Sequence, residues 1–393
     1  MIYIKKMKDN ENKNNKVPKL SLIFKTINSE EKIFDFRKNV VLTTTDEIKD
    51  ESYYYIRTTK NMINKIKEQK YIDNNNSLLF RARKSNKGYY ELISPIEDCS
   101  LVDSGNYNID IINQLDKKMW YILPTEDKEN KYENENKQYN LLENDIIKMG
   151  QRKYEIIKKN INISNKLEPE EKNLIFSYPQ IKIDGKNKNK ICDLCKKSEN
   201  KEDKLVLKFC NCEKYMHYSC LKNSLKIEES ENQKKNVISY ECKNFNCETC
   251  KIPYSYKYEI KNENGDKEII SLIDIKVPEE SVNYIILESL TFIHHSENEK
   301  NIFVVKLNDE EITIGKDNKC DIVDLNKTIS REQAILKFNK DNGNLNLINK
   351  GRYGTLVLIK NNVKLKVNEK IYIQMENTNI KAEVKEDNEK FKK

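Results

Sequence analysis

Seven cysteines and one histidine have the types and spacing that metal binding requires. They form four close pairs with one or two residues between the members: Cys192–Cys195, Cys210–Cys212, His217–Cys220 and Cys247–Cys250. One tight turn presents both members of such a pair to one ion, and thiolate with imidazole is a ligand combination that zinc prefers. Because eight ligands complete two tetrahedral sites with no position left for water, the pattern predicts two structural Zn2+ ions.

The other cysteines and the apolar segments bear on the cellular compartment. The chain has ten cysteines, its first twenty residues lack the apolar region of a signal peptide, and its apolar stretch at 284–293 is too short to cross a bilayer. We therefore expect a soluble, intracellular protein, cytoplasmic or nuclear, whose reduced thiols bind metal and do not form disulfides. Cys99 and Cys320 are expected to be small buried side chains. Cys242 is either a bystander or a replacement for Cys247 as a ligand.

The segment that contains the four pairs resembles the RING-variant (RING-CH, C4HC3) zinc finger through its motifs CDLC, FCNCEKYMHYSCL and CETCKIPYSY. The resemblance implies a cross-brace, in which the first and third pairs bind one ion and the second and fourth pairs bind the other. It also implies a ubiquitin ligase that holds a ubiquitin-charged conjugating enzyme (E2) in position for attack by a substrate lysine. The implied E2-contact residues are Leu194, Lys251 and Pro253, and the family's tryptophan is replaced by Ser224.

The PHD finger, a reader of histone tails, shares this ligand order. The interval between Cys212 and His217 suits a PHD finger, and Phe245 lies where that family has an aromatic residue. The single residue between Cys210 and Cys212 is shorter than most PHD fingers have. We therefore prefer the RING-variant interpretation.

A second group of polar residues lies in EITIGKDNKCDIVDLNKTISREQAILKF (311–338) and NLNLINKGRYGTLVLI (344–359). These motifs resemble the forkhead-associated (FHA) domain, a β-sandwich whose loops at one end bind phosphothreonine peptides. Such a site needs a cation and hydroxyl or backbone donors around the phosphate. The resemblance implies a phosphorylated protein client and a site formed by Lys316, Ser330, Arg331, Arg352, Tyr353, Gly354 and Thr355.

Three positions depart from the FHA pattern. Lys316 replaces an arginine and so loses its bidentate geometry, Gln333 replaces a histidine, and Tyr353 replaces an asparagine. The alternative for Ser330 and Arg331 is a capped, ion-paired surface turn with no ligand.

Strands are the elements that must position both groups, since the apolar runs are rich in β-branched and aromatic residues. The predicted fold class is multidomain and mainly β: a β-rich N-terminal domain, a small two-zinc cross-brace finger and a C-terminal FHA-type β-sandwich. This combination resembles an arrangement found in protist, notably ciliate, proteins. The predicted divisions are a disordered tail (1–18), a β-rich domain open to interpretation as a degenerate FHA-type copy (19–158), a linker (159–190), the RING-CH finger (191–256), a connector (257–295), the FHA domain (296–385) and a polar tail (386–393).

The charge distribution limits the kinds of partner that we expect the protein to bind. The net charge of +8 arises from 71 basic and 63 acidic residues that are mixed along the chain and form no basic stripe. We expect neither a nucleic-acid partner nor a membrane partner. The predicted function is a RING-type E3 ubiquitin ligase that recruits phosphorylated clients through its FHA domain. The alternative is a non-catalytic zinc and FHA scaffold, or a PHD-like reader.

Overall fold

The computed structural model describes most of the chain between its predicted tails. The described residues are 18–27, 40–49, 51–58, 60, 62–68, 76–94, 115–124, 138–162, 180–182, 190–198, 206–210, 212–232, 236–243, 245–261, 267–290, 299–352 and 354–386. Cys99, Tyr353, and nearly all of the predicted tails lie outside this set. Within it, no helix combines the length and the apolar character that a membrane crossing requires. The predicted mainly β fold class is confirmed.

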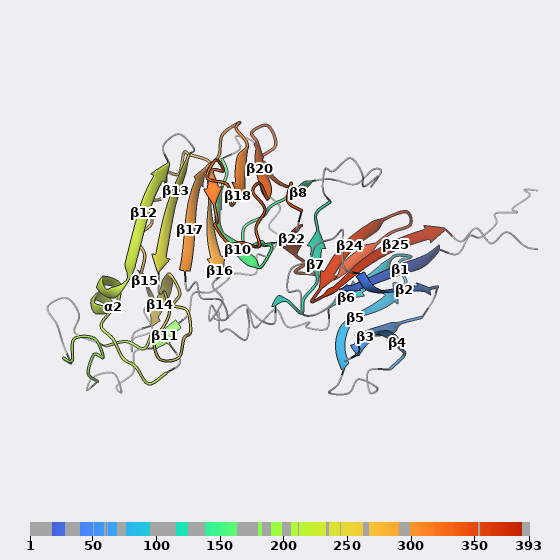
Figure 1. The fold of residues 1–393 in the computed structure, drawn as a ribbon, viewed down its shortest axis with the longest axis horizontal. Helices are drawn as coiled ribbons and strands as arrows, with labels where there is room; N and C mark the ends of the chain where they lie inside the picture. Colours follow the sequence, from blue (N-terminus) through green and yellow to red (C-terminus); the bar gives the residue numbers. More distant parts are fainter. Residues whose placement is uncertain are drawn as a thin grey trace, which may run out of the picture.

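The first β-sandwich packs two five-stranded layers around one apolar core (Figure 1). One layer has the order β2-β1-β25-β24-β7, and the facing layer has the order β23-β6-β5-β3-β4. Alternate residues of β25 are buried, as expected for a strand with one face on a core. The strands are β1 (Pro18–Ile27), β2 (Val40–Ile48), β3 (Tyr53–Thr58), β4 (Ile63–Ile66), β5 (Asn76–Lys84), β6 (Tyr90–Ile93), β7 (Trp120–Ile122), β23 (Val363–Leu365), β24 (Lys370–Met375) and β25 (Thr378–Glu386).

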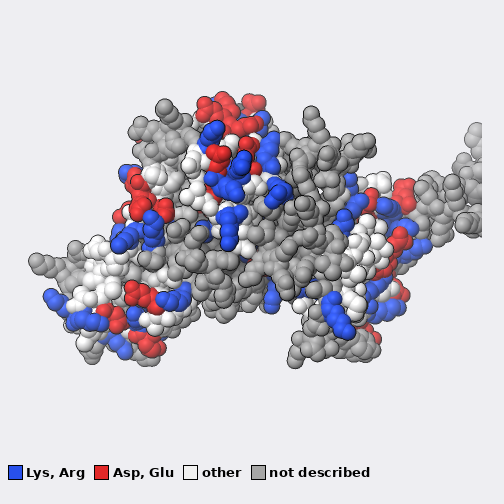
Figure 2. All heavy atoms as spheres, in the orientation of Figure 1, with Lys and Arg blue, Asp and Glu red and all other residues white. Residues whose placement is uncertain are grey.

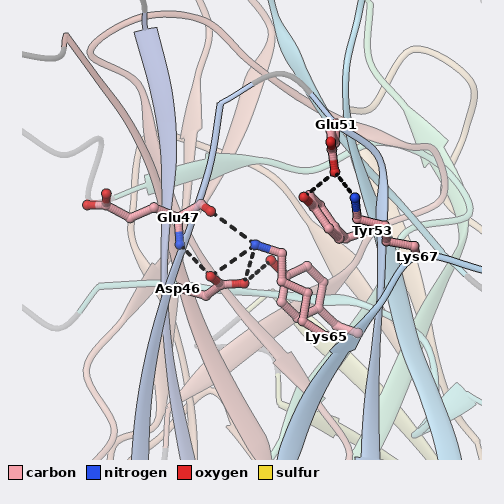
Figure 3. A network of polar contacts seen from close by, with 7 residues as sticks. Asp46, Glu47, Glu51, Tyr53, Lys65 and Lys67 are labelled. Carbon is pink, nitrogen blue, oxygen red and sulfur yellow. Dashed lines mark hydrogen bonds and ion pairs between the residues drawn. The ribbon is translucent and has the colours of Figure 1, made fainter.

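A polar network at one end of this sandwich ties its two layers together (Figure 3). Asp46 of β2 accepts a hydrogen bond of 2.6 Å from the Tyr55 hydroxyl of β3 and pairs with Lys65 of β4 at 3.0 Å. The Lys65 ammonium group also lies 4.0 Å from the centre of the Tyr53 ring. Because the charged side chains of Asp46 and Lys65 are only half-buried, their ion pair contributes little to overall stability, and the buried Tyr55 hydroxyl anchors the two layers.

The second β-sandwich has the same strand order. One layer reads β17-β16-β10-β9-β22 and the other reads β8-β21-β20-β18-β19, and both contribute to one apolar core. The strands are β8 (Gln138–Asn140), β9 (Ile146–Met149), β10 (Arg152–Asn160), β16 (Tyr284–Leu290), β17 (Glu299–Lys306), β18 (Ile312–Gly315), β19 (Ile322–Val323), β20 (Ala334–Asn339), β21 (Asn344–Asn349) and β22 (Thr355–Leu358).

The two sandwiches exchange three strands. Strands β8, β9 and β10 follow β7 in the chain but complete the second sandwich, whereas β23, β24 and β25 follow β22 but complete the first. Figure 1 shows the result directly, because the blue strands β1 and β2 lie beside the red strands β24 and β25. The pairing therefore crosses the boundaries that the sequence predicts for domains 19–158 and 296–385.

One continuous sheet of twelve strands joins the sandwiches and extends beyond them. Strand β22 pairs with β7, with Leu356 opposite Ile122, and this pairing links the two sandwiches. At the other end, the hairpin of β12 (Lys226–Asn232) and β13 (Val237–Lys243) adds to the edge of β17. This hairpin comes from the chain between Cys220 and Cys247, so the predicted finger is built onto the second sandwich.

The rest of the predicted finger, together with a small sheet from the segments on either side of it, lies below this hairpin in the view of Figure 1. Helix α2 (Tyr218–Ser224) leads into β12, and a separate three-stranded sheet has the order β11-β14-β15. Its strands are β11 (Gln180–Lys182), β14 (Lys257–Lys261) and β15 (Lys267–Ser271). A core cluster shared by these elements and β13, β16 and β17 runs from the finger into the large sheet. Regular strands therefore occur within the segments 159–190 and 257–295, which the sequence predicts to be a linker and a connector.

Candidate functional site

The eight predicted metal ligands gather in two groups of four. Within each group the candidate ligand atoms lie within 4.8 Å of one another: Cys192, Cys195, His217 and Cys220 in one, and Cys210, Cys212, Cys247 and Cys250 in the other. These groups have the cross-braced order that the RING-variant resemblance implies. Tetrahedral zinc with Zn–S bonds of about 2.3 Å places sulfur atoms roughly 3.8 Å apart. The Cys212 and Cys247 sulfurs, at 3.6 Å, are close to this separation.

The same backbone turn presents one cysteine pair in each group, Cys192–Cys195 in the first and Cys247–Cys250 in the second. The Lys196 amide donates to the Cys192 carbonyl, and the Lys251 amide donates to the Cys247 carbonyl, both at 2.8 Å. Lys196 and Lys251 both adopt positive φ, of 59° and 58°. This left-handed residue closes the turn directly after the second cysteine and directs both sulfurs to one side.

The orientation of His217 and the hydrogen-bond donors around the cysteine sulfurs suit a bound cation. His217 is fully buried, its Nδ1 atom lies 3.3 Å from the Cys195 sulfur, and its Nε2 atom lies 3.3 Å from the Ser198 carbonyl. With Nδ1 facing the sulfurs, Nε2 donates to that carbonyl and fixes the ring, as in known metal sites. Burial raises the pKa of the Cys192 and Cys247 thiols, but backbone N–H donors outweigh it and bring each pKa down to about 7. The backbone N–H donors therefore favour the thiolate form of Cys192 and Cys247, which is the form that binds metal.

The remaining predicted finger residues have different environments. Leu194 is 47% exposed on the first turn, and Lys251 is exposed on the second. Pro253 is half-buried and pairs by a β-bridge with Asn246. Ser224 is exposed at the end of α2, where its hydroxyl donates to the Leu221 carbonyl at 2.7 Å.

Two residues that the sequence left open lie inside the finger core. Cys242 of β13 is fully buried and belongs to neither ligand group. Phe245 is also buried, and its ring meets the Tyr254 ring edge-on at 6.1 Å between centroids. Phe245 therefore packs the core and forms no open aromatic surface for a peptide.

Apart from Tyr353, which lies outside the described residues, and Thr355, the first residue of β22, the predicted phosphopeptide residues lie on three loops at one end of the second sandwich. The Lys316 amide donates to the Ser330 carbonyl at 3.0 Å, and the Arg352 amide donates to the Ser330 hydroxyl at 3.2 Å. Arg331 and Arg352 are exposed, and Lys316 is half-buried. The backbones of three cationic residues thus meet at one serine, and cationic side chains are the groups that bind a phosphate dianion.

Gln333 holds these loops together. It is fully buried; its Oε1 atom accepts from the Ser330 amide at 3.0 Å, and its Nε2 atom donates to the Gly354 carbonyl at 2.8 Å. The Gly351 backbone amide also donates to the Gln333 backbone carbonyl at 2.8 Å. A methyl group on Gly351 would lie 2.3 Å from the Gln333 side-chain nitrogen, Nε2. Gln333 therefore has a structural role in place of the histidine that the FHA pattern has there.

Sequence reasoning missed the residues that support the Ser330 loop from the first half of the chain. Gly150, Arg152 and Tyr154, at the tip and start of the β9–β10 hairpin, contact residues 324–328. No local pattern marks them, because their partners lie more than one hundred residues away along the chain.

The comparisons with known proteins bear on the second sandwich. Residues 312–377 match the family model of the FHA domain. Searches of curated proteins and of solved structures returned no match. The matched residues include β18 to β22 of the second sandwich, but they also include β23 and β24, which complete the first. The match does not extend to the finger at 191–256.

Proposed function

We propose that the second sandwich binds a phosphothreonine peptide of a client protein. The FHA match supports this function, and the grouping of Lys316, Arg331 and Arg352 around Ser330 supports the position of the phosphate. Gln333 fixes the loops in advance, so little ordering is required when the peptide binds. The exposed guanidinium groups supply charge-assisted hydrogen bonds to the phosphate.

The two cysteine and histidine groups are proposed to hold two Zn2+ ions. The donor set of seven thiols and one imidazole, gathered in two compact groups of four, fits tetrahedral zinc with no open position. Zinc in such a site supplies structure and no chemical step. The eight protein ligands would hold the finger in the shape that its exposed surface requires.

The finger is proposed to act as a RING-type ubiquitin ligase because its eight ligands group in the cross-braced order of that family, and the pairing of β13 with β17 supports a fixed geometry. Residues from Val237 to Lys243 pair with residues from Glu299 to Val305, so the finger and the second sandwich share one sheet. A ligase of this type acts by holding a charged E2 and its client in a fixed geometry. A continuous sheet between the two binding regions would provide that geometry, with Leu194, Lys251 and Pro253 facing the E2.

A crossed experiment separates the two halves of this function. Ubiquitin discharge from a panel of E2 enzymes and capture on a degenerate phosphothreonine peptide library are measured on the same zinc-replete protein. We expect Leu194→Ala to reduce discharge and leave peptide capture intact, and Ser330→Ala to do the reverse. Leu142→Ala is the matched control, since Leu142 is 42% exposed against 47% for Leu194. A wild-type chain that discharges no E2 in the panel would contradict the ligase proposal.

A non-catalytic scaffold is the second candidate, and Ser224 favours it. The position that has a tryptophan in RING-variant fingers here presents an exposed hydroxyl, so the E2 surface lacks a large apolar contact. This candidate predicts peptide capture, two zinc ions per chain by elemental analysis and no discharge. Recovery of discharge by Ser224→Trp would show that the missing contact is the reason.

A further inference from the structure

The loop that leads to Ser330 rests on a hairpin from the first half of the chain. A methyl group on Gly150, which has a φ of +58°, would lie 2.3 Å from the Thr328 carbonyl oxygen. The Gln151 amide donates to the Thr328 hydroxyl at 3.0 Å. The tip of the β9–β10 hairpin is thus in direct contact with the loop two residues before Ser330, and only glycine fits there without displacing it.

Buried polar contacts attach the same hairpin to the start of this loop. Arg152 lies 3.3 Å from the Asp324 carboxylate, and the Tyr154 hydroxyl donates to the same carboxylate oxygen. Asp324 and both of its partners are buried. A buried carboxylate requires such partners, so the hairpin stabilises the position of Asp324.

Hydrogen bonds within the loop connect Asp324 to Ser330. The Asn326 amide donates to the Asp324 carboxylate at 2.8 Å, and the Thr328 amide and hydroxyl donate to the Asn326 side-chain oxygen at 2.9 and 2.6 Å. The Ile329 amide then donates to the Asn326 carbonyl at 3.0 Å. Each step fixes the backbone of the next turn, so a displacement at Asp324 reaches Ser330.

We propose that Gly150, Arg152 and Tyr154 are positioning residues for the phosphopeptide site, which is therefore composite and requires residues from both halves of the chain. This inference rests on the proposed phosphopeptide function. It identifies determinants of affinity that lie outside the residues matched to the FHA family. A peptide would not touch these three residues; they act through the loop.

The β24–β25 hairpin, which follows the second sandwich in the chain, cannot replace the β9–β10 hairpin in this role. Met149 pairs with Arg152 across one hairpin, and Met375 pairs with Thr378 across the other, so Thr378 and Ile380 hold the positions of Arg152 and Tyr154. Neither threonine nor isoleucine neutralises a buried carboxylate. A fragment that starts at β16 and refolds with its own β24 and β25 would therefore leave Asp324 unpaired.

Two matched pairs of variants in the full chain test the proposal. Gly150→Ala is compared with Gly88→Ala, because Gly88 also has positive φ, of +82°, but a methyl group there has no neighbour within 4 Å. Tyr154→Phe is compared with Tyr90→Phe, which removes another buried hydroxyl, one bonded to the backbone of the first sandwich. The probe is the phosphothreonine peptide that the wild-type chain selects from a degenerate library, with its unphosphorylated form as reference.

We expect Gly150→Ala and Tyr154→Phe each to weaken peptide binding by about tenfold, the first because its methyl group displaces the loop and the second because it loses one buried hydrogen bond. The Gly88 and Tyr90 variants should bind as the wild type does. Amide hydrogen exchange of residues 324–331 should become faster in the first two variants only. Unchanged affinity together with unchanged exchange would overturn the proposal.

The hydrogen-exchange measurement also distinguishes a failure of the positioning proposal from a failure of the proposed phosphopeptide function. If the wild-type chain selects no phosphopeptide, the proposed function fails, and faster exchange at 324–331 still establishes the positioning contacts. If the wild type binds and Gly150→Ala proves unfolded, Tyr154→Phe decides, because it removes one hydroxyl without changing the shape of the side chain. Equal affinity and equal exchange in Tyr154→Phe and Tyr90→Phe would then reject the positioning role.

Discussion

The two sandwiches have one strand order but differ in how the exchanged hairpin is held. In the first, Arg57 of β3 pairs with Glu376 and Asn377 at the tip of the β24–β25 hairpin. In the second, Arg152 of the exchanged hairpin pairs with the buried Asp324 of the loop. The β24–β25 hairpin thus contributes an acidic residue to a basic partner, and the β9–β10 hairpin contributes a basic residue to an acidic partner. This difference indicates that buried polar contacts specify which hairpin belongs to which sandwich, because the apolar alternation of the strands fits either.

The sandwiches also differ at the outer edge of the sheet. Strand β17 of the second sandwich is extended by the finger hairpin β12–β13, whereas its counterpart β2 has no further strand in the described part of the chain. We therefore expect the second sandwich, and not the first, to lose stability when the finger unfolds. Its candidate ligand site lies on the same sandwich as this extension.

The largest expected effect comes from removing zinc. Chelation, or His217→Ala, should unfold the finger, because structural zinc in such small modules contributes about 10 kcal/mol or more to folding. Hydrogen exchange should accelerate through β12 and β13 and extend to β17, while β1 and β2 keep their protection. Equal loss of protection in both sandwiches, or in neither, would contradict the asymmetry described above.

A smaller effect is expected from breaking the polar contacts of the hairpins. Arg152→Met leaves the Asp324 charge buried with a neutral neighbour, and it should lower the free energy of unfolding by about 3 kcal/mol. Arg57→Met in the first sandwich should cost about 1 kcal/mol, since the Arg57 and Glu376 side chains are 13% and 20% exposed and partly solvated. Chemical denaturation measures both, and the order of the two losses is the test.

A third effect is gradual and concerns pH. Lys153 of β10 is buried beside Asp116, and burial lowers the pKa of Lys153 to about 8, with Lys148 nearby adding to the effect and Asp116 opposing it. The unfolded chain therefore binds more protons than the folded chain between about pH 8 and the ordinary lysine pKa. Stability should rise with pH across this window, by at most about 1.4 kcal/mol per pH unit.

The matched comparison for this trend is the first sandwich. Arg152 and Thr378 are the first paired residues after the turn in their hairpins, so the next residues, Lys153 and Asn379, occupy equivalent positions. We expect Lys153→Met to flatten the rise in denaturant midpoint between pH 8 and 10. A rise that persists in Lys153→Met would assign the pH dependence to another group.

The sequence predicted the local chemistry better than the long-range pairing. Close spacing such as that of Cys192 and Cys195 predicts that both sulfurs face one side, and the structure places the four pairs in two groups. The strand-rich character followed from alternation and residue type. In contrast, a strand with period-two alternation fits any partner with one apolar face, so nothing in residues 146–160 or 370–386 indicates that these strands are exchanged.

The support of the candidate phosphopeptide site was unpredictable for a related reason. Gln333 was identified as a departure from a pattern, yet its role depends on backbone groups of Gly351 and Gly354 that only the folded loops bring within reach. Asp324 reads as an ordinary loop residue. Its burial, and its need for Arg152, arise from packing between segments that are far apart in the chain.

The pairing of β1 with β25 has a consequence for how the protein folds as it is made. Leu20 lies opposite Ile48 of β2 on one side and opposite Val384 of β25 on the other, so one edge of β1 finds its partner only after more than 350 further residues have been synthesised. Loop closure over such a separation is slow. Until residues 363–386 are synthesised, the core lacks the apolar side chains of β23, β24 and β25, and both this core and the free edge of β1 are open to aggregation. We therefore expect the first sandwich to be completed later than the second, whose last strand in the chain is β22.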